Sequence, residues 1–390
     1  MKRHIYMDYG ATTPVDPEVL NEMRPYFSEI FGNPSSTHAF GIDAEEKISE
    51  CRRQTAAIIG ANEESIIFTS GGTEADNLAI KGIAYQHLDV CSQKGPHIIT
   101  STIEHPAVLE TLKYLEKKGF KIEYLPVDKD GLIDVDTLEG TIAKHTFLIS
   151  IMTANNEIGT IEPINEIGKI AHDHDVIFHT DAVQAIGKST LDVKKDHIDL
   201  LSISSHKIYG PKGSGALYVG ENIKLEPLFH GGGHERGVRS STLNTPGIVG
   251  LGKACELARK RFSIDTVHMK KLRDMLIENV LHIDESFLNG HPTKRLVNNA
   301  HFRFTAIEGE SLHMLLDDKG IAAATGSACS SKKLRPSHVL LALGLSAEES
   351  HGSIRFTLGR LSTKQDVIDT AEALGPIIEK LRHMSPLWKR

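Results

Sequence analysis

The segment VIFHTDAVQAIG, residues 176–187, shows most directly how this chain folds. Its apolar and β-branched residues predict a strand over Val176–Thr180, which ends directly before Asp181. In open α/β sheets, ligands bind in the crevice outside the carboxyl ends of the strands, so we expect the Asp181 carboxylate to lie at such a site. An aspartate that only caps a turn or a helix is the alternative interpretation of this residue taken alone.

Short apolar runs alternate with helical patterns on both sides of this segment. Further strands are predicted at Ile66–Thr69, His97–Ser101, Lys121–Leu125, Thr146–Met152, Leu200–Ser204 and Ala216–Val219. Helices are predicted between them at Thr73–Gln86, Pro106–Lys118 and Ile164–His172. Several strands are nearly continuous apolar runs, as expected where helices cover both faces of a sheet. This order predicts a large, doubly wound, mainly parallel α/β domain.

The pattern changes from about Pro246 onward. A long helical stretch, of one or two helices, covers Pro246–His282. Strands are then predicted at Ala300–Thr305, Ile321–Ala324 and Ser353–Leu358, and helices at Glu310–Asp318 and Lys364–His383. We therefore expect a large domain over residues 15–255 and a smaller α+β domain formed by residues 1–14 and 256–390. A site between two packed domains is the expected place for a ligand.

The composition excludes several classes of protein. The net charge of −7 argues against a general nucleic-acid binder. Four cysteines without a CxxC pair exclude a disulfide framework and a structural zinc site, and they favour a reducing compartment. No apolar run reaches the roughly 18 residues that a membrane span needs, and the first residues lack the apolar core of a secretory signal. We expect a cytoplasmic protein that binds neither nucleic acid nor a membrane.

A lysine follows a second strand end. The segment LSISSHKIYGPKGSGALYV, residues 201–219, predicts a strand that leads through Ser204, Ser205 and His206 to Lys207. Most lysines are exposed, but this one lies between an apolar strand and a glycine- and proline-rich turn. Desolvation there would lower the pKa of the amine and make it nucleophilic.

A third segment, FTSGGTEADNLAI at residues 68–80, predicts a strand, a glycine pair and a helix that opens at Thr73. Backbone amides at a helix N-terminus beside a hydroxyl can cradle a phosphate. It is neither a Walker loop nor a GxGxxG motif, and many such turns bind nothing. Together, however, a phosphate cradle, a strand-end carboxylate and a strand-end lysine are the parts that pyridoxal phosphate requires.

The sequence resembles the cysteine desulfurases of the NifS/IscS type, which belong to class V of the aminotransferase-fold enzymes that use pyridoxal phosphate. The matching segments run nearly end to end: ATTPVD (11–16), FGNPSSTH (31–38), TSGGTEADN (69–77), EHPAV (104–108), NNEIGT (155–160), SSHKIYGPKGSGALYV (204–219), GGGHERGVRSSTLN (231–244), TGSACSS (325–331), SIRFTLGR (353–360) and SPLW (385–388). The resemblance implies the aminotransferase-like fold, pyridoxal phosphate as cofactor, and conversion of L-cysteine to L-alanine.

The resemblance also implies roles for individual residues around the cofactor. Lys207 matches the lysine that forms the Schiff base, Asp181 the partner of the pyridine nitrogen, Gln184 the donor to the phenolic oxygen, and His105 the imidazole that stacks on the ring and moves protons. The phosphate-binding positions are Gly72, Thr73, Ser204 and His206, with Ser205 between them.

Three further matches concern the substrate and a second subunit. Asn155 matches a contact to cofactor and substrate, and Arg355 the clamp on the substrate carboxylate, which suits the bidentate fork of a guanidinium. Thr242 matches a phosphate contact that the second subunit supplies, which implies a homodimer. Ser205 and Ser241 stand where the family frequently has glycine.

Cys329 distinguishes this interpretation from that of an ordinary aminotransferase. It lies in a run of small residues, Thr325–Ser331, and Lys332 and Lys333 add positive charge that favours its thiolate. The resemblance implies that Cys329 receives the sulfur as a persulfide, passes it to an iron–sulfur scaffold or another acceptor, and can transiently ligate an iron–sulfur cluster. A small buried thiol without a role is the alternative.

Other features receive simpler interpretations. Cys51, Cys91 and Cys255 are expected to take no part in sulfur transfer. His172, His174 and His179 are close in sequence, but a strand through His179 makes a common metal site improbable, and no resident metal is expected. Selenocysteine lyase or aminotransferase activity on the same fold, and a catalytically weak partner in a cluster-assembly complex, are the alternative functions.

Overall fold

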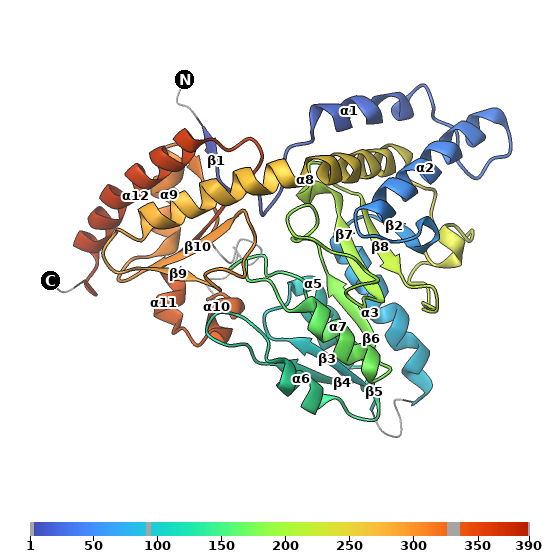
Figure 1. The fold of residues 1–390 in the computed structure, drawn as a ribbon, viewed down its shortest axis with the longest axis horizontal. Helices are drawn as coiled ribbons and strands as arrows, with labels where there is room; N and C mark the ends of the chain where they lie inside the picture. The colour runs from blue at the N-terminus through green and yellow to red at the C-terminus, as the bar shows by residue number, and fades with distance from the viewer. Residues whose placement is uncertain (1–3, 91–94, 326–335, 389–390) are drawn as a thin grey trace.

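The computed structural model describes residues 4–90, 95–325 and 336–388, and its larger part is built around a seven-stranded sheet (Figure 1). The strand order is β2-β8-β7-β6-β5-β3-β4. The strands are β2 (Ile66–Thr69), β3 (His97–Ser101), β4 (Lys121–Leu125), β5 (Thr146–Ser150), β6 (Ile177–Asp181), β7 (Leu200–Ser204) and β8 (Gly215–Val219). All seven predicted strands are therefore present, with ends that differ by at most two residues.

The sheet is mainly parallel. Strands β4, β3, β5, β6 and β7 run parallel to one another, whereas β8 pairs antiparallel with both β7 and β2. A short turn is enough to join antiparallel neighbours, and residues 205–214 connect β7 to β8 in this way. The predicted doubly wound class is confirmed.

Alternation along the strands divides their side chains between two helical layers. Ile66 and Phe68 pack with α2 (Ala39–Ala57), α7 (Ile164–Asp173) and the first half of α8 (Thr245–Val280). The intervening Ile67 faces the opposite layer, formed by α3 (Gly72–Ala84) and α5 (Pro106–Glu116). Buried residues on both faces explain why these strands have nearly continuous apolar sequences.

A second core lies in the smaller part of the molecule. An antiparallel sheet of order β12-β10-β9 and a parallel pair of β1 with β11 pack against α9 and α12. The elements are β1 (Ile5–Tyr6), β9 (Ser286–Asn289), β10 (Asn299–Phe304), α9 (Gly309–Asp318), β11 (Ile321–Ala322), β12 (Ser353–Thr357) and α12 (Lys364–Met384). Thr363 and Asp366 form a capping box that fixes where α12 begins.

Helix α8 joins the two cores. Ile248 and Leu257 belong to the core of the large sheet, whereas Leu272 and Val280 belong to the smaller core. The structure shows one continuous helix where the sequence allowed two, and Figure 1 shows it running across both parts. The expected domain boundary at residues 255 and 256 falls inside this helix.

Strands β1 and β9 were not predicted from the sequence, and neither were the remaining elements. They are α1 (Pro17–Met23), α6 (Val135–Thr141), α10 (His338–Ala342), α11 (Ala347–His351) and short 3-10 turns at Arg24–Phe27, Glu63–Ser65, Tyr85–Val90, Ser205–Lys207 and Glu235–Gly237. In the described residues, none of the helices has the length and apolar character needed to cross a bilayer.

Candidate functional site

Three of the predicted site residues, Asp181, Lys207 and His105, lie at the carboxyl edge of the parallel strands. Asp181 is the last residue of β6, and Lys207 lies in the 3-10 turn that follows β7. His105 follows β3 and caps α5, where its Nδ1 accepts a hydrogen bond from the Ala107 amide at 3.1 Å. Both residues therefore lie at strand ends, as predicted, and the structure adds that the two strands, β6 and β7, are neighbours.

The amine of Lys207 is held by the N-terminal segment. Its Nζ donates to the carbonyl oxygens of Gly10, at 2.6 Å, and Ala11, at 2.9 Å. Gln184 Nε2 donates to the same Gly10 carbonyl at 3.0 Å. Residues far apart in sequence thus form one wall, and the sequence did not predict that Gly10 and Ala11 belong to it.

A cavity of about 420 Å³ lies next to the start of α3. It is lined by Ala11, Thr12, Ser70, Gly71, Gly72, Thr73, Glu74, Ser204, His206, Lys212 and Gly213. A Cβ on Gly72 would stand 2.7 Å from Val183 Cγ2, so only glycine lets the helix N-terminus approach this closely. Four of the predicted phosphate-binding residues therefore line one cavity.

The chemistry of the cavity fits a phosphate ester. Helix N-terminal amides, the hydroxyl side chains of Thr73 and Ser204, and the cation of Lys212 are all suitable donors. Glu74 would oppose an anion, but Arg239 Nε binds its Oε1 at 2.8 Å and the Ser70 amide binds its Oε2 at 2.9 Å. Burial would raise the pKa of Glu74, yet these two partners lower the pKa below its usual value.

Asp181, His105 and Lys207 interact electrostatically in this site. Burial raises the pKa of Asp181, while His105, the Val183 amide and Lys207 all act to lower it. Burial lowers the pKa of His105, Asp181 opposes this, and the charge of Lys207 adds to it. The imidazole is therefore neutral near pH 7, and a pyridinium nitrogen beside Asp181 would stabilise its charged carboxylate.

Ser205, which stands between two residues that line the cradle, is fully buried. Its Oγ lies in the space that a Cβ on Gly210 would occupy. The serine that replaces the frequent glycine at 205 thus requires glycine at 210.

Asn155 is fully buried, and its side chain forms hydrogen bonds with backbone groups. Its Nδ2 donates to the Ile103 carbonyl at 2.8 Å, and its Oδ1 accepts from the Glu157 and Ile158 amides at 2.9 and 3.0 Å. These bonds shape the loop between β5 and α7. The expected contact with cofactor or substrate remains a prediction.

Arg355 lies in β12 and is nearly buried. Its guanidinium donates to Asp8 Oδ1 at 2.9 Å and to the Asn156 carbonyl at 2.8 Å. Its backbone pairs with Ala324, through bonds of 2.7 and 3.1 Å. The described segment that precedes residues 326–335 therefore ends close to Arg355. Cys329 itself lies outside the described residues.

The other predicted positions are dispersed. Thr242 is exposed and does not line the cradle of its own chain. Cys51 and Cys255 are buried free thiols whose pKa burial raises to about 12, while Cys91 lies outside the described residues. His179 lies inside the sheet between Ser150 and Ser202, whereas His174 pairs with Glu139.

Sequence reasoning missed several buried ionisable groups near the site. Lys188 Nζ donates to the Gln184 and Lys207 carbonyls at 3.1 and 3.3 Å, and burial lowers its pKa to about 7. Burial raises the pKa of Glu104 to about 8 and that of Asp76 well above its usual value. Lys188 follows Gln184 by four residues, but this spacing predicts their hydrogen bond only if the conformation of the turn between them is already known.

The family model described as Aminotransferase class-V matches residues 5–369, and the chain belongs to this family of pyridoxal-phosphate enzymes. Within it, the chain is a cysteine desulfurase by its full-length relatives. It is 55% identical to "Cysteine desulfurase IscS" of Methanosarcina thermophila, over 98% of this chain and 94% of that protein. It is 52% identical to the protein of the same name from Dictyoglomus turgidum, over 100% and 99%.

Solved structures agree in fold. A structure described as "NIFS-LIKE PROTEIN" superposes with a TM-score of 0.90 at 38% identity, covering 97% of this chain and 100% of that one. A second, described as "SspA in complex with cysteine", has a TM-score of 0.81 at 39% identity and covers 92% and 100%.

Proposed function

We propose that this protein removes sulfur from L-cysteine, releases L-alanine, and receives the sulfur as a persulfide on Cys329. The observation that carries the proposal is the meeting of Lys207, Asp181 and His105 beside a phosphate cradle. Pyridoxal phosphate, when bound, supplies the electron sink for the bond changes at the substrate Cα and Cβ. Its phosphate would be held by Gly72, Thr73, Ser204 and His206.

Lys207 is the proposed attachment point of the cofactor. The Gly10 and Ala11 carbonyls fix the position of its amine, and Gln184 shares the first of them. Asp181 would hold the proton on the pyridine nitrogen, since its buried carboxylate gains a cationic partner there. His105, neutral because burial lowers its pKa, can accept and return a proton on the substrate.

Arg355 is the proposed ligand of the substrate carboxylate. Its guanidinium already holds Asp8, so the substrate has to share or replace that partner. Because Arg355 also pairs with Ala324 through its backbone, the substrate would bind next to the chain that leads to Cys329. The related SspA structure is a complex with cysteine, which supports this substrate.

The sulfur step needs a reactive thiolate. The Cys329 thiolate would attack the substrate sulfur, so that an S–S bond forms as the substrate C–S bond breaks and its electrons return to the carbon. Cys51 and Cys255 do not suit this step, because burial raises their thiol pKa to about 12. An iron–sulfur scaffold, as the name of the relatives suggests, or another thiol acceptor would then take the sulfur, within the cytoplasm.

We also propose a homodimer. Thr242 is exposed and lies apart from the cradle of its own chain, as a residue that serves a neighbouring subunit would. The rings of Phe31 and Phe40 are 5.7 Å apart and remain 66% and 56% exposed, which marks an apolar surface that a partner could cover. A monomeric mass in solution together with full activity would contradict this.

The function is tested by following alanine release from L-cysteine with a reductant present. Wild type should release alanine repeatedly, Cys329→Ala should not, and Cys51→Ala should match wild type. Alanine release by Cys329→Ala at the wild-type rate would contradict desulfuration. Release of selenide from selenocysteine by Cys329→Ala would favour a selenocysteine lyase, and amino transfer to an oxoacid would favour an aminotransferase.

A further inference from the structure

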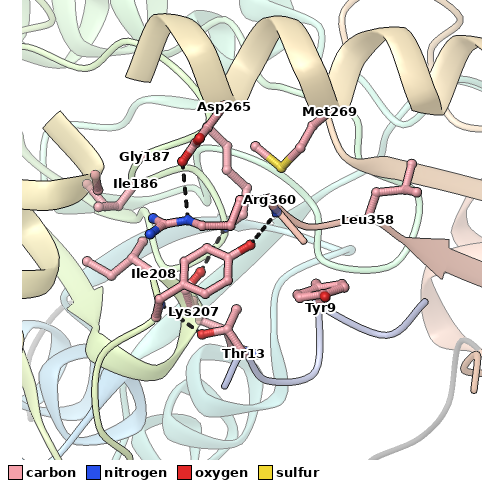
Figure 2. Close-up of a pocket in the computed structure, with 13 residues that line it drawn as sticks. Tyr9, Thr13, Ile186, Gly187, Lys207, Ile208, Asp265, Met269, Leu358 and Arg360 are labelled. Carbon is pink, nitrogen blue, oxygen red and sulfur yellow. Dashed lines mark hydrogen bonds and ion pairs between the residues drawn. The ribbon is translucent and has the colours of Figure 1, made fainter. Parts of the chain in front are cut away.

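A small cavity next to Lys207 lies between residues of the two cores (Figure 2). Its walls come from the N-terminal segment, residues 186–188 after β6, the Lys207 turn, helix α8 and the chain after β12. Arg360, five positions after Arg355, lines it together with Leu358 of the smaller core. None of the steps proposed above uses Arg360.

The side chain of Arg360 is only 8% exposed and lies between two carboxylates. Its Nη1 donates to Asp16 Oδ2 at 2.7 Å, and its Nε forms an ion pair with Asp265 Oδ2 at 3.3 Å. Asp16 precedes α1 and Asp265 lies in α8, so one side chain connects the start of the large domain, the bridging helix and the end of β12. Burial of a guanidinium is costly unless it is paired in this way.

Arg360 also holds Tyr209, two residues after Lys207. The guanidinium lies over the Tyr209 ring, 3.9 Å from its centroid, and the Arg360 amide donates to the Tyr209 hydroxyl at 2.7 Å. Both the face and the hydroxyl of this ring are therefore fixed by one residue.

The backbone at Tyr209 is strained. Its φ of +68° is a left-handed conformation that a bulky side chain rarely adopts. The turn is held by the Tyr209 amide, which donates to Thr13 Oγ1 at 2.8 Å, and by the Asp16 amide, which donates to the Tyr209 carbonyl at 2.9 Å. A strained backbone conformation persists only where several neighbouring contacts hold it in place. Here these contacts are the two hydrogen bonds to Thr13 and Asp16 together with those of Arg360.

We propose that Arg360 is a positioning residue for Lys207. It keeps the Tyr209 turn in its strained conformation and ties that turn to the strand carrying Arg355, so that the amine and the substrate-carboxylate clamp keep a fixed separation. The inference rests on the proposed role of Lys207. It concerns the geometry of the cofactor lysine and not the binding of the carboxylate itself.

The test begins with wild-type holoenzyme reduced by borohydride. Peptide mass spectrometry should find the cofactor on Lys207; finding it elsewhere would overturn the proposed function, and with it the inference, whereas the variants below test the role of Arg360 alone. In Arg360→Gln, the visible circular dichroism of bound cofactor should fall by about half or more, and kcat should fall about tenfold with KM within about twofold. Arg360→Lys, which keeps the charge, should restore part of both.

Two further variants separate positioning from stability. Tyr209→Phe removes only the hydroxyl that the Arg360 amide binds, so it should show a smaller fall in kcat and in the circular dichroism of the cofactor. This result can be measured even if Arg360→Gln folds poorly. Arg382→Gln is the matched control, because Arg382 is also buried and stacks on a ring, Trp388 at 4.2 Å, but lies in α12 and donates to the Thr305 and Glu285 carbonyls. Its spectrum and kcat per bound cofactor should match wild type. Arg360→Gln behaving like this control would overturn the inference.

Discussion

Replacing Gly72 by alanine tests the phosphate cradle at its tightest point. The added methyl carbon would stand 2.7 Å from Val183 Cγ2 and 3.5 Å from Ser204 Cβ. The first separation is far inside van der Waals contact, so either Val183 or the start of α3 has to move. Overpacking of this kind typically costs about 1–3 kcal/mol. Because Val183 follows Asp181 closely and its amide binds the Asp181 carboxylate at 2.9 Å, either shift disturbs a proposed cofactor contact.

The expected result is weaker cofactor binding. A cost of about 1.4 kcal/mol corresponds to about a tenfold rise in the dissociation constant, which a titration of cofactor-free protein by visible absorbance would measure. Gly140→Ala is the control, since a Cβ there meets nothing within 4 Å in helix α6. Val183→Ala added to Gly72→Ala should recover most of the affinity. Wild-type affinity in Gly72→Ala alone would refute the steric argument.

Three further predictions concern the substrate clamp and pH. Arg355→Gln should raise the KM for L-cysteine about tenfold or more, because it removes the charged fork proposed to bind the carboxylate. Asp8→Asn should lower that KM a few-fold, because it removes the anion that competes for Arg355 in the structure. Steady-state assays of alanine release measure the KM of both variants. An unchanged KM in Arg355→Gln would exclude Arg355 as the ligand of the substrate carboxylate. Burial lowers the pKa of His179 to about 3, so the folded protein keeps this ring neutral while the unfolded chain takes up a proton below its ordinary value of 6.5. The contribution of His179 to the free energy of unfolding is therefore lost as pH falls from 6.5 toward 3, and the loss is about 2 kcal/mol at pH 5. Between pH 7 and pH 5, the free energy of unfolding of His179→Asn, measured with denaturant, should fall by correspondingly less than that of wild type.

Local sequence patterns predicted the large sheet well. Strands such as Leu200–Ser204 and His97–Ser101 have bounds identical to those predicted, because buried parallel strands need apolar residues on both faces. The position of Asp181 and Lys207 followed from the same rule, since strand ends collect at one edge. The sequence left open whether Thr245–Val280 is one helix or two, because its two halves belong to different cores.

Contacts between distant segments could not be predicted from the sequence. The Gly10 and Ala11 carbonyls reach Lys207 across nearly 200 residues, and Asp8 reaches Arg355 across 347. These contacts depend on how the N-terminal segment crosses from one core to the other, which no local pattern encodes. Arg360 likewise has no signal of its own in the sequence, since its importance comes from the strained turn at Tyr209.

The most direct test of the account is the site of the sulfur after turnover. Wild-type holoenzyme is incubated with L-cysteine, its free thiols are blocked, and its peptides are analysed by mass spectrometry without reduction. The account predicts one added sulfur atom on the peptide that contains Cys329 and none on those with Cys51, Cys91 or Cys255. An added sulfur on one of these three cysteines, with Cys329 unmodified, would contradict it.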